Sequence, residues 1–421
     1  MSLIDQILAV SRAATEDARA RAVMRLSLLD WLACGIAGQD EPVAVATRAL
    51  ISDEGGAGQA TLFGGARAPA RAVALANGAA SHALDYDDTH FAHIGHPSVA
   101  ALSAAMAVGE RERAPLSRIL DAALMGCEAS IRFGVLFGRS HYQVGFHQTA
   151  TAGAFGATVA AGHILGLTDA QMRHALSLVS TRAAGLKSQF GTMGKPFNAG
   201  IAASNGVEAA LLASHGFTSN PEALDGVNGF LATHHCDGTA DQPTTPFMTS
   251  ISHKYHACCH GLHATLEALA TLPRPDPAQI TAITITTHPR WLTVCNIPEP
   301  STGLQLKFSY RAIAAAALLG HETAALSTYT DALCADPALI HLRDRTTVHH
   351  DATLSETESL VRIDTAAGAF EAHHDLDAPQ PLEQRADRLL GKAAALLGTS
   401  KAHQLWQAIE TQNLHEITGQ M

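Results

Sequence analysis

The chain has 421 residues, which is long for one domain and short for three, so its length predicts two domains or one large one. Acidic residues outnumber basic ones by 39 to 28, the formal net charge is -11, and no stretch gathers Lys and Arg into a basic face. This balance argues against nucleic acid as a partner.

The first residues, MSLIDQILAVSRAATEDARARA, lack the charged and apolar regions of a secretory leader, and no apolar run approaches ~18 residues. We therefore expect no membrane partner. Seven cysteines, an odd number without C-x-x-C spacing, predict reduced thiols rather than a disulfide framework or a zinc ribbon. Together these features predict a soluble cytoplasmic protein.

Helical periodicity interrupted by glycine dominates the chain up to about residue 270, and strand-like alternation is nearly absent there. Three prolines then precede alternating β-branched residues at 281–287, which predicts a linker followed by a strand. The segment 358–376 predicts a hairpin, and 308–320 a helix between strands. The tail returns to helical periodicity, so we expect a mainly α protein whose second, α+β part is followed by helices that pack back on the first.

The segment ALDYDDTHFAHIGHPS, residues 83–98, gathers three aspartates and three histidines in a chain of which only 16% is charged. A helix-like run precedes it and Pro97 suits the first turn of another helix, so these groups are expected in a connecting loop. There Asp85, Thr89 and His96 can offer a carboxylate base, a hydroxyl and an imidazole near one substrate carbon. Proton abstraction beside a carboxylate requires groups of these kinds.

Two other interpretations of this loop stay open. In the first, Asp87 or Asp88 only caps a helix, and the histidines are solvated. In the second, His90, His93 and His96, which recur at every third residue, bind a metal. The Gly and Pro in FAHIGHP oppose the helix that would bring these imidazoles together, and the chain has no H-E-x-x-H motif. We therefore expect no metal.

Two later segments carry single residues that suit a cleft. In GFHQTATAGAFGA, residues 145–157, His147 stands at the start of a helix of small residues. In GTMGKPFNAGIAASNG, residues 191–206, Lys195 lies between Gly and Pro, and its ammonium can pair with a substrate carboxylate. The alternative for each is a solvated surface side chain.

The segment KYHACCHGLHATLEAL, residues 254–269, has three histidines before a helix, of which His263 is the preferred polar contributor. The adjacent Cys258 and Cys259 are expected to be packing residues, because neighbouring thiols do not easily share a tetrahedral metal. In LKFSYRA, residues 306–312, Tyr310 is a further candidate, with a core aromatic as its alternative.

Taken in order, ALDYDDTH with GHPS, GFHQT, GTMGKP and ACCHGLH resemble the 2-methylcitrate dehydratase (MmgE/PrpD) family over nearly the whole chain. This family also includes cis-aconitate decarboxylase and iminodisuccinate epimerase. The resemblance implies a large all-helical domain, here 1–270 with 395–421, and an inserted α+β lid domain, here 271–394. It further implies a homodimer without a metal cofactor. Because the loop candidates belong to the first domain and Tyr310 to the second, we expect the active site in the cleft between them.

Matched motif by motif, the resemblance assigns family site positions to individual residues. The catalytic candidates are Asp85, His96, His147, Lys195 and Tyr310, and the substrate-binding candidates are Thr89, Asn198 and His263. Asn198 replaces a histidine common in the family, and Cys259 falls where the decarboxylase has an active-site histidine. Asn198 keeps a hydrogen-bond donor but cannot carry a positive charge, so the preference for substrate carboxylates is expected to differ.

The sequence thus predicts a cofactor-free, dehydratase-like lyase that removes a proton α to a carboxylate of a small di- or tricarboxylic acid. Such a C–H bond is very weakly acidic, so cations and hydrogen-bond donors must stabilise the charge that develops on the enolate. One alternative is an epimerase of a dicarboxylate such as iminodisuccinate. The other is a non-catalytic homologue that only binds a carboxylate, which Asn198 favours.

Overall fold

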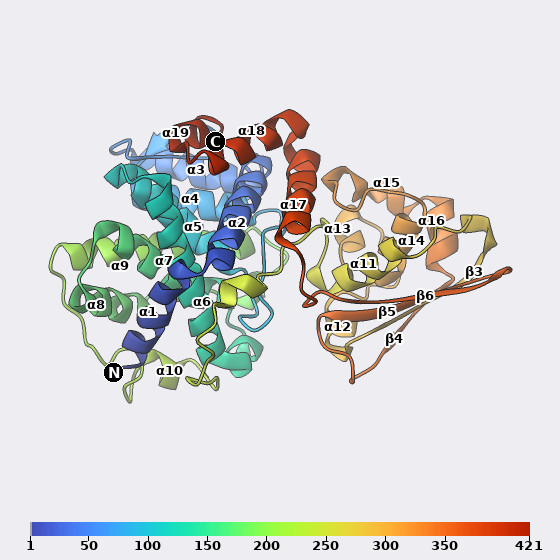
Figure 1. Cartoon of the computed structure of the whole chain (residues 1–421), viewed down its shortest axis with the longest axis horizontal. Helices are drawn as coiled ribbons and strands as arrows, with labels where there is room; N and C mark the ends of the chain where they lie inside the picture. The colour runs from blue at the N-terminus through green and yellow to red at the C-terminus, as the bar shows by residue number, and fades with distance from the viewer. Residues whose placement is uncertain (1) are drawn as a thin grey trace. The chain divides into compact units, whose positions relative to one another are not determined.

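The computed structural model describes residues 2–421 and is mainly helical, with 59% of residues in helices and 10% in strands. The predicted mainly α class is therefore confirmed. Contacts between residues divide the chain into two compact units. Figure 1 colours the chain by residue number, from blue at the N-terminus to red at the C-terminus. The first unit comprises Met1–His253 with Leu382–Met421, and the second comprises Lys254–Pro381. No helix within residues 2–421 is long and apolar enough to cross a membrane.

The first unit consists of helices and one minimal hairpin, β1–β2. Its elements are α1 (Leu3–Ala13), α2 (Ala18–Ala37), α3 (Pro42–Glu54), β1 (Ala60–Thr61), β2 (Arg67–Ala68), α4 (Ala70–His82), α5 (Pro97–Glu112), α6 (Leu116–Val144), α7 (Gln148–Leu165), α8 (Asp169–Ser180), α9 (Gly194–Ser214), α10 (Phe230–Thr233), α17 (Leu382–Leu397), α18 (Thr399–Glu410) and α19 (Leu414–Gly419). The expectation that this part is entirely helical is wrong at β1 and β2, where a glycine-rich segment folds back on itself.

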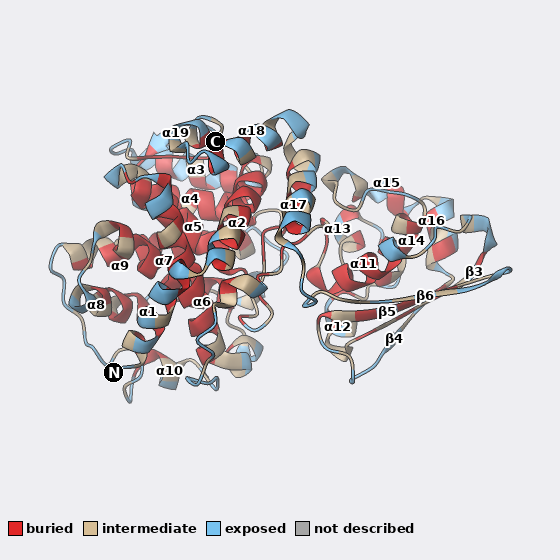
Figure 2. Cartoon of the chain, viewed as in Figure 1, coloured by how far each residue is buried: buried red, intermediate tan, exposed pale blue. Residues whose placement is uncertain are grey.

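Small residues allow the central helices of the first unit to approach closely. Helix α7 packs against α5, α6 and α9, and α4 packs against α9. Figure 2 shows α5 and α7 coloured almost entirely as buried. A Cβ placed on Gly78 of α4 would lie 2.9 Å from the Cα of Gly200 on α9. Helices α4 and α9 are therefore held together at backbone distance; α4 leads into the loop of candidate residues, and α9 carries Lys195 and Asn198 near its start.

The second unit combines a four-stranded sheet, in the order β4-β3-β5-β6, with short helices. Strand β3 runs parallel to β4 and antiparallel to β5, which pairs antiparallel with β6. Its elements are α11 (His263–Thr271), β3 (Ile280–Thr287), α12 (Pro289–Val294), α13 (Gly303–Leu306), α14 (Tyr310–Leu318), α15 (Asp331–Cys334), α16 (Pro337–Arg343), β4 (Thr346–His350), β5 (Glu358–Thr365) and β6 (Gly368–Asp375).

The local predictions for this unit agree with the structure. The alternating segment forms β3, in which Ile283 and Ile285 are buried between more exposed threonines. The predicted hairpin forms β5–β6, and the predicted helix forms α14.

The boundaries between the units differ from those predicted. They fall after His253 and after Pro381, instead of after residues 270 and 394. Helix α11 packs on β5 and β6 and so belongs to the second unit, whereas α17 packs on α2 and so belongs to the first. The three prolines before residue 281 correctly predicted a loop. They could not show which unit each neighbouring helix packs against.

The close approach of α4 and α9 gives a stability prediction. We expect Gly200→Ala to lower the free energy of unfolding by about 1–3 kcal/mol, because its Cβ would lie 2.3 Å from the carbonyl oxygen of Leu75. Denaturant titration measures this difference. The matched control is Gly391→Ala on α17, where a Cβ meets nothing within 4 Å. It should be neutral or raise stability by about 0.5–1 kcal/mol through helix propensity. Equal stability of the two variants would contradict the packing described.

Candidate active site

The loop between α4 and α5 brings together most of the candidate residues of the first unit. Helix α4 ends at His82 and α5 begins at Pro97, so the predicted position of the loop is confirmed. Asp85 adopts a left-handed backbone conformation with φ of 52°, which is uncommon for a residue with a side chain.

Asp85 is the more accessible of these two carboxylates and contacts two nitrogen groups. Its Oδ1 lies 2.6 Å from Nζ of Lys195 and 3.3 Å from Nε2 of His96. The Asp85 side chain is 34% exposed, against 18% for Lys195. Lys195 occupies the first turn of α9, so the Gly-Lys-Pro sequence forms a helix start and directs the ammonium toward the loop. The structure therefore brings Lys195 to Asp85 and His96, two residues that the sequence proposed together in the loop.

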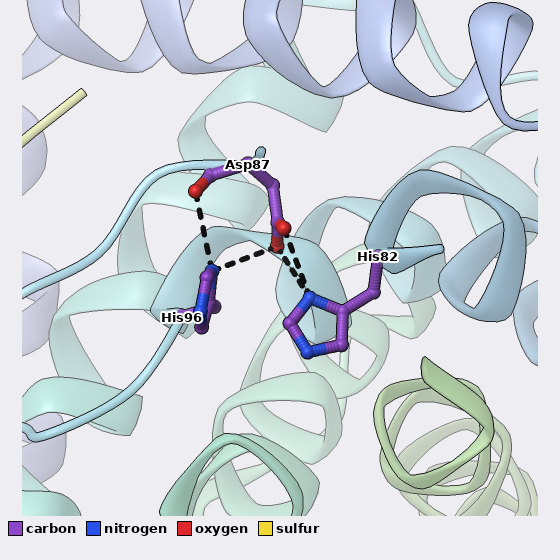
Figure 3. Close-up of side chains that lie close together, drawn as sticks. All are labelled: His82, Asp87 and His96. Carbon is purple, nitrogen blue, oxygen red and sulfur yellow. Dashed lines mark hydrogen bonds and ion pairs between the residues drawn. The ribbon is translucent and has the colours of Figure 1, made fainter. Parts of the chain in front are cut away.

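Asp87 is buried, with a side chain only 4% exposed, and it bonds to two imidazoles (Figure 3). The Nδ1 atom of His82 lies 2.9 and 3.0 Å from its two carboxylate oxygens. The Nδ1 atom of His96 lies 3.2 Å from Oδ2 and 3.2 Å from the backbone carbonyl oxygen of Asp87. His96 thus bridges the buried carboxylate of Asp87 and the accessible carboxylate of Asp85.

Electrostatics assign a different charge state to each member of this cluster. Burial raises the pKa of Asp87, but the neighbouring His82 and His96 outweigh burial and hold the pKa well below its usual range. Burial lowers the pKa of His96, but the charge of Asp87 and hydrogen bonds to both aspartates raise it to about 9. Burial lowers the pKa of His82 despite Asp87. Near neutral pH, Asp87 is therefore an anion, His96 a cation and His82 neutral.

His147 lies beside this cluster as a neutral imidazole. Burial, followed by the neighbouring His82, holds its pKa well below the usual range. Its ring stacks on His82 with centroids 6.0 Å apart, and it meets the Phe190 ring nearly at right angles, with centroids 4.9 Å apart. The side-chain amide of Asn198 donates to Nδ1 of His147 at 3.3 Å, which leaves the hydrogen of the neutral ring on Nε2. Asn198 therefore sets the tautomer of His147.

The cluster of His82, Asp87 and His96 also has the ligand types and the spacing that could hold a metal ion. Single ligand atoms from His82, Asp87 and His96 all lie within 4.8 Å of one another. In the part of the chain that the structure describes, His90 and His93 belong to no such group, so the spacing of every third histidine does not create a ligand set. Each Nδ1 in the cluster points at an oxygen of Asp87 at hydrogen-bond distance. This geometry suits a hydrogen-bonded triad, and the expectation of a metal-free site stays a prediction.

Three other candidates lie apart from these contacts or in the second unit. Thr89 pairs its backbone with Ser252, its amide donating to the Ser252 carbonyl at 2.9 Å. Tyr310 is fully buried in the second unit, where its hydroxyl donates to the carbonyl of Gly261 at 2.5 Å. His263 is also buried there, and burial holds its pKa well below the usual range. The roles of these three residues stay predictions.

Sequence reasoning missed two members of the site. His82 falls within the helix-like run before the loop and received no role of its own, and Asp87 was offered only as a possible helix cap. Asp87 instead accepts hydrogen bonds from His82 and His96. A signal was present, because a histidine in the last turn of a helix lies five residues before this aspartate. Without the fold, nothing showed that the chain turns back between them.

Comparison with known proteins matches both parts of the chain to one family. The MmgE/PrpD N-terminal domain matches residues 7–242, and the MmgE/PrpD C-terminal domain matches residues 256–407. The chain belongs to the MmgE/PrpD family. The resemblance seen in the four sequence motifs is thereby confirmed.

Curated MmgE/PrpD relatives are named for one activity. Cis-aconitate decarboxylase-like protein oryM of Aspergillus oryzae is 30% identical over 272 residues, which is 59% of this chain and 56% of that protein. Cis-aconitate decarboxylase of Aspergillus terreus is 31% identical over 291 residues, 63% of this chain and 59% of the relative. The human cis-aconitate decarboxylase is 34% identical over 170 residues, 39% of this chain and 35% of the relative. The matches span less than two thirds of each relative.

The charge on His96 gives a prediction for pH. Because its pKa in the folded protein is raised to about 9, above the ordinary value near 6.5, we expect it to stay protonated through neutral pH. Its contribution to stability is complete below about 6.5 and is lost as pH rises through about 9. NMR titration of protein with ¹⁵N-labelled histidine measures this pKa. A value near 6.5 or below for His96 would contradict the assignment.

The variant Asp87→Asn tests the origin of this charge. It removes the anion nearest to His96, so we expect the pKa of His96 to fall and the pH at which the folded state loses stability to fall with it. The same NMR titration and melting curves at several pH values measure both effects. Asp241→Asn, an exposed surface substitution, is the control and should leave the titration unchanged. An unaltered His96 titration in folded Asp87→Asn would show that Asp87 does not supply the charge.

Proposed function

We propose that this protein is a lyase that acts on a small di- or tricarboxylic acid by forming a carbanion beside a carboxylate. The single observation that carries the proposal is the contact of Asp85 with both Lys195 and His96. Of the two clustered carboxylates of the loop, Asp85 is substantially exposed and Asp87 is buried. Two cationic groups therefore meet at the accessible one. In a chain with net charge -11, they supply the local positive charge that an anionic substrate needs.

In this proposal the two cations bind substrate carboxylate and stabilise the enolate-like charge. The reaction needs this stabilisation because removal of a proton beside a carboxylate creates a dianion. Asp85 is the general base, since it is accessible and Asp87 is buried between two imidazoles. Lys195 and His96 hold it ionised and aligned before substrate arrives. The proton goes from the substrate carbon to the Asp85 carboxylate.

His147 is proposed as a hydrogen-bond donor to the substrate, either at the group that leaves or beside the carbon that is reprotonated. As a neutral ring with its hydrogen on Nε2, it can donate to a substrate oxygen without adding a fixed charge. Asn198 acts through His147, and Thr89, His263 and Tyr310 remain candidate contributors. The same proposal includes a lid role for the second unit, a homodimer, a cytoplasmic location and a site without metal or other cofactor.

Two reactions fit such a carbanion and differ in the group that leaves. In dehydration, Asp85 takes the proton from carbon and then returns it to the β-hydroxyl, which leaves as water. In decarboxylation, carbon dioxide leaves first and the carbanion is then protonated. The names of the Aspergillus and human relatives favour testing cis-aconitate, which would give carbon dioxide and a dicarboxylic acid. Epimerisation would need only proton removal and return on the opposite face.

The decisive experiment is incubation with citrate, 2-methylcitrate and cis-aconitate in deuterated water, followed by NMR and carbon dioxide detection. We expect deuterium at the carbon beside a carboxylate, together with loss of water or carbon dioxide from at least one acid. Deuterium incorporation and inverted configuration without elimination would favour an epimerase. Binding by calorimetry with neither exchange nor product would favour a non-catalytic homologue and would contradict the proposal.

Lys195→Met tests the cation that holds the substrate. Removing a charged contact that strengthens in the transition state costs about 3–4 kcal/mol, so we expect the rate to fall about 100- to 1,000-fold on the active acid. Lys195→Arg should also fail, because a planar guanidinium directs its donors differently. Melting curves exclude unfolding. Near-normal turnover by a folded Lys195→Met protein would show that Lys195 is an ordinary surface residue.

A further inference from the structure

A buried lysine from the C-terminal part of the chain contacts the backbone of the candidate active-site loop. Lys392 lies on α17, and its side chain is 1% exposed. Its Nζ lies 2.5 Å from Oδ1 of Asp30 on α2, whose side chain is also 1% exposed. The same Nζ donates to the backbone carbonyl of Tyr86 at 2.5 Å. It also lies 3.9 Å from the centre of the Tyr86 side-chain ring.

Tyr86 stands between the two carboxylates that define the site. Its carbonyl belongs to the peptide group that continues into Asp87, and on its other side Asp85 holds a left-handed conformation. The Lys392 ammonium, paired with Asp30, therefore binds the turn at the Tyr86 carbonyl, directly between the accessible carboxylate and the buried one.

Stability alone does not explain a buried ion pair at this place. Taking two charges out of water costs about as much as their attraction returns, and well-packed apolar residues often replace such pairs without loss. An apolar pair could not donate to the Tyr86 carbonyl. Burial lowers the pKa of Lys392, but Asp30 outweighs burial and raises it, so the ammonium keeps its three hydrogens to donate.

We propose that Lys392 is a positioning residue that fixes the Asp85–Asp87 turn by holding the Tyr86 carbonyl, with Asp30 as its counterion. It touches neither Asp85 nor Asp87 through its side-chain hydrogen bonds, and it acts through the backbone between them. Its effect on catalysis rests on the function proposed above. Its effect on the turn does not, and can be measured in a protein without substrate.

Three variants of the full-length chain separate positioning from general stability. Lys392→Met removes the donor but leaves Asp30 buried without its counterion. The double variant D30N/K392M removes both charges and keeps side chains of similar size at both positions. Leu389→Ala is the matched control, because Leu389 is a buried residue one turn away on α17, and its truncation weakens packing while leaving Lys392 in place.

Amide hydrogen–deuterium exchange of a peptide covering residues 83–89 is the first measurement, read with melting curves. We expect D30N/K392M to melt near the wild-type temperature and yet exchange this peptide faster, while peptides from α5 and α7 stay protected. Leu389→Ala should melt lower without selective exchange at 83–89. A folded double variant with wild-type exchange in this peptide would overturn the proposal, whatever the activity of the protein.

Turnover on the active acid is the second measurement. Displacing catalytic groups by about 1 Å can cost about 100-fold, so we expect D30N/K392M to lose about that factor in kcat, whereas Leu389→Ala keeps wild-type kcat. Faster exchange with unchanged kcat would overturn the positioning role. A wild-type protein inactive on every acid would contradict the proposed function alone, since the exchange measurement still decides whether Lys392 holds the turn.

Discussion

The burial of Asp87 between two imidazoles is the constraint on which the candidate site depends. A carboxylate removed from water is costly unless it is hydrogen-bonded and paired, and here His82 and His96 provide both forms of compensation. The same anion gives His96 its positive charge, which His96 presents to Asp85 on its other ring nitrogen. Loss of Asp87 would therefore alter the charge at a carboxylate that it does not touch.

The scaffold around this cluster is built for close approach. Gly78 and Gly200 let α4 and α9 meet at backbone distance, and these helices carry His82 and Lys195 into the site from two directions. The C-terminal helix α17 adds Lys392, whose contact with Tyr86 ties the loop to α2. A closely packed helical frame that contacts the loop at several points suits chemistry that depends on preorganised charges.

Membership of the MmgE/PrpD family and the charge pattern of the site point to the same class of chemistry. The curated relatives are named for decarboxylation of cis-aconitate, and the cluster pairs two cations with one accessible carboxylate. Burial keeps the His147 imidazole neutral, and the Asn198 amide, which donates to its Nδ1, leaves the ring hydrogen on Nε2.

The sequence by itself determined the mainly helical class, the loop that ends at Pro97, strand β3 and the family, because helix periodicity, proline and short motifs are local. It also nominated Asp85, His96 and Lys195. Only the tertiary structure decided that Asp85 pairs with Lys195, that His82 shares Asp87 with His96, and that Lys392 reaches Tyr86 from 306 residues away. The physical reason is that helix packing sets these distances, and no local pattern records which helix faces which.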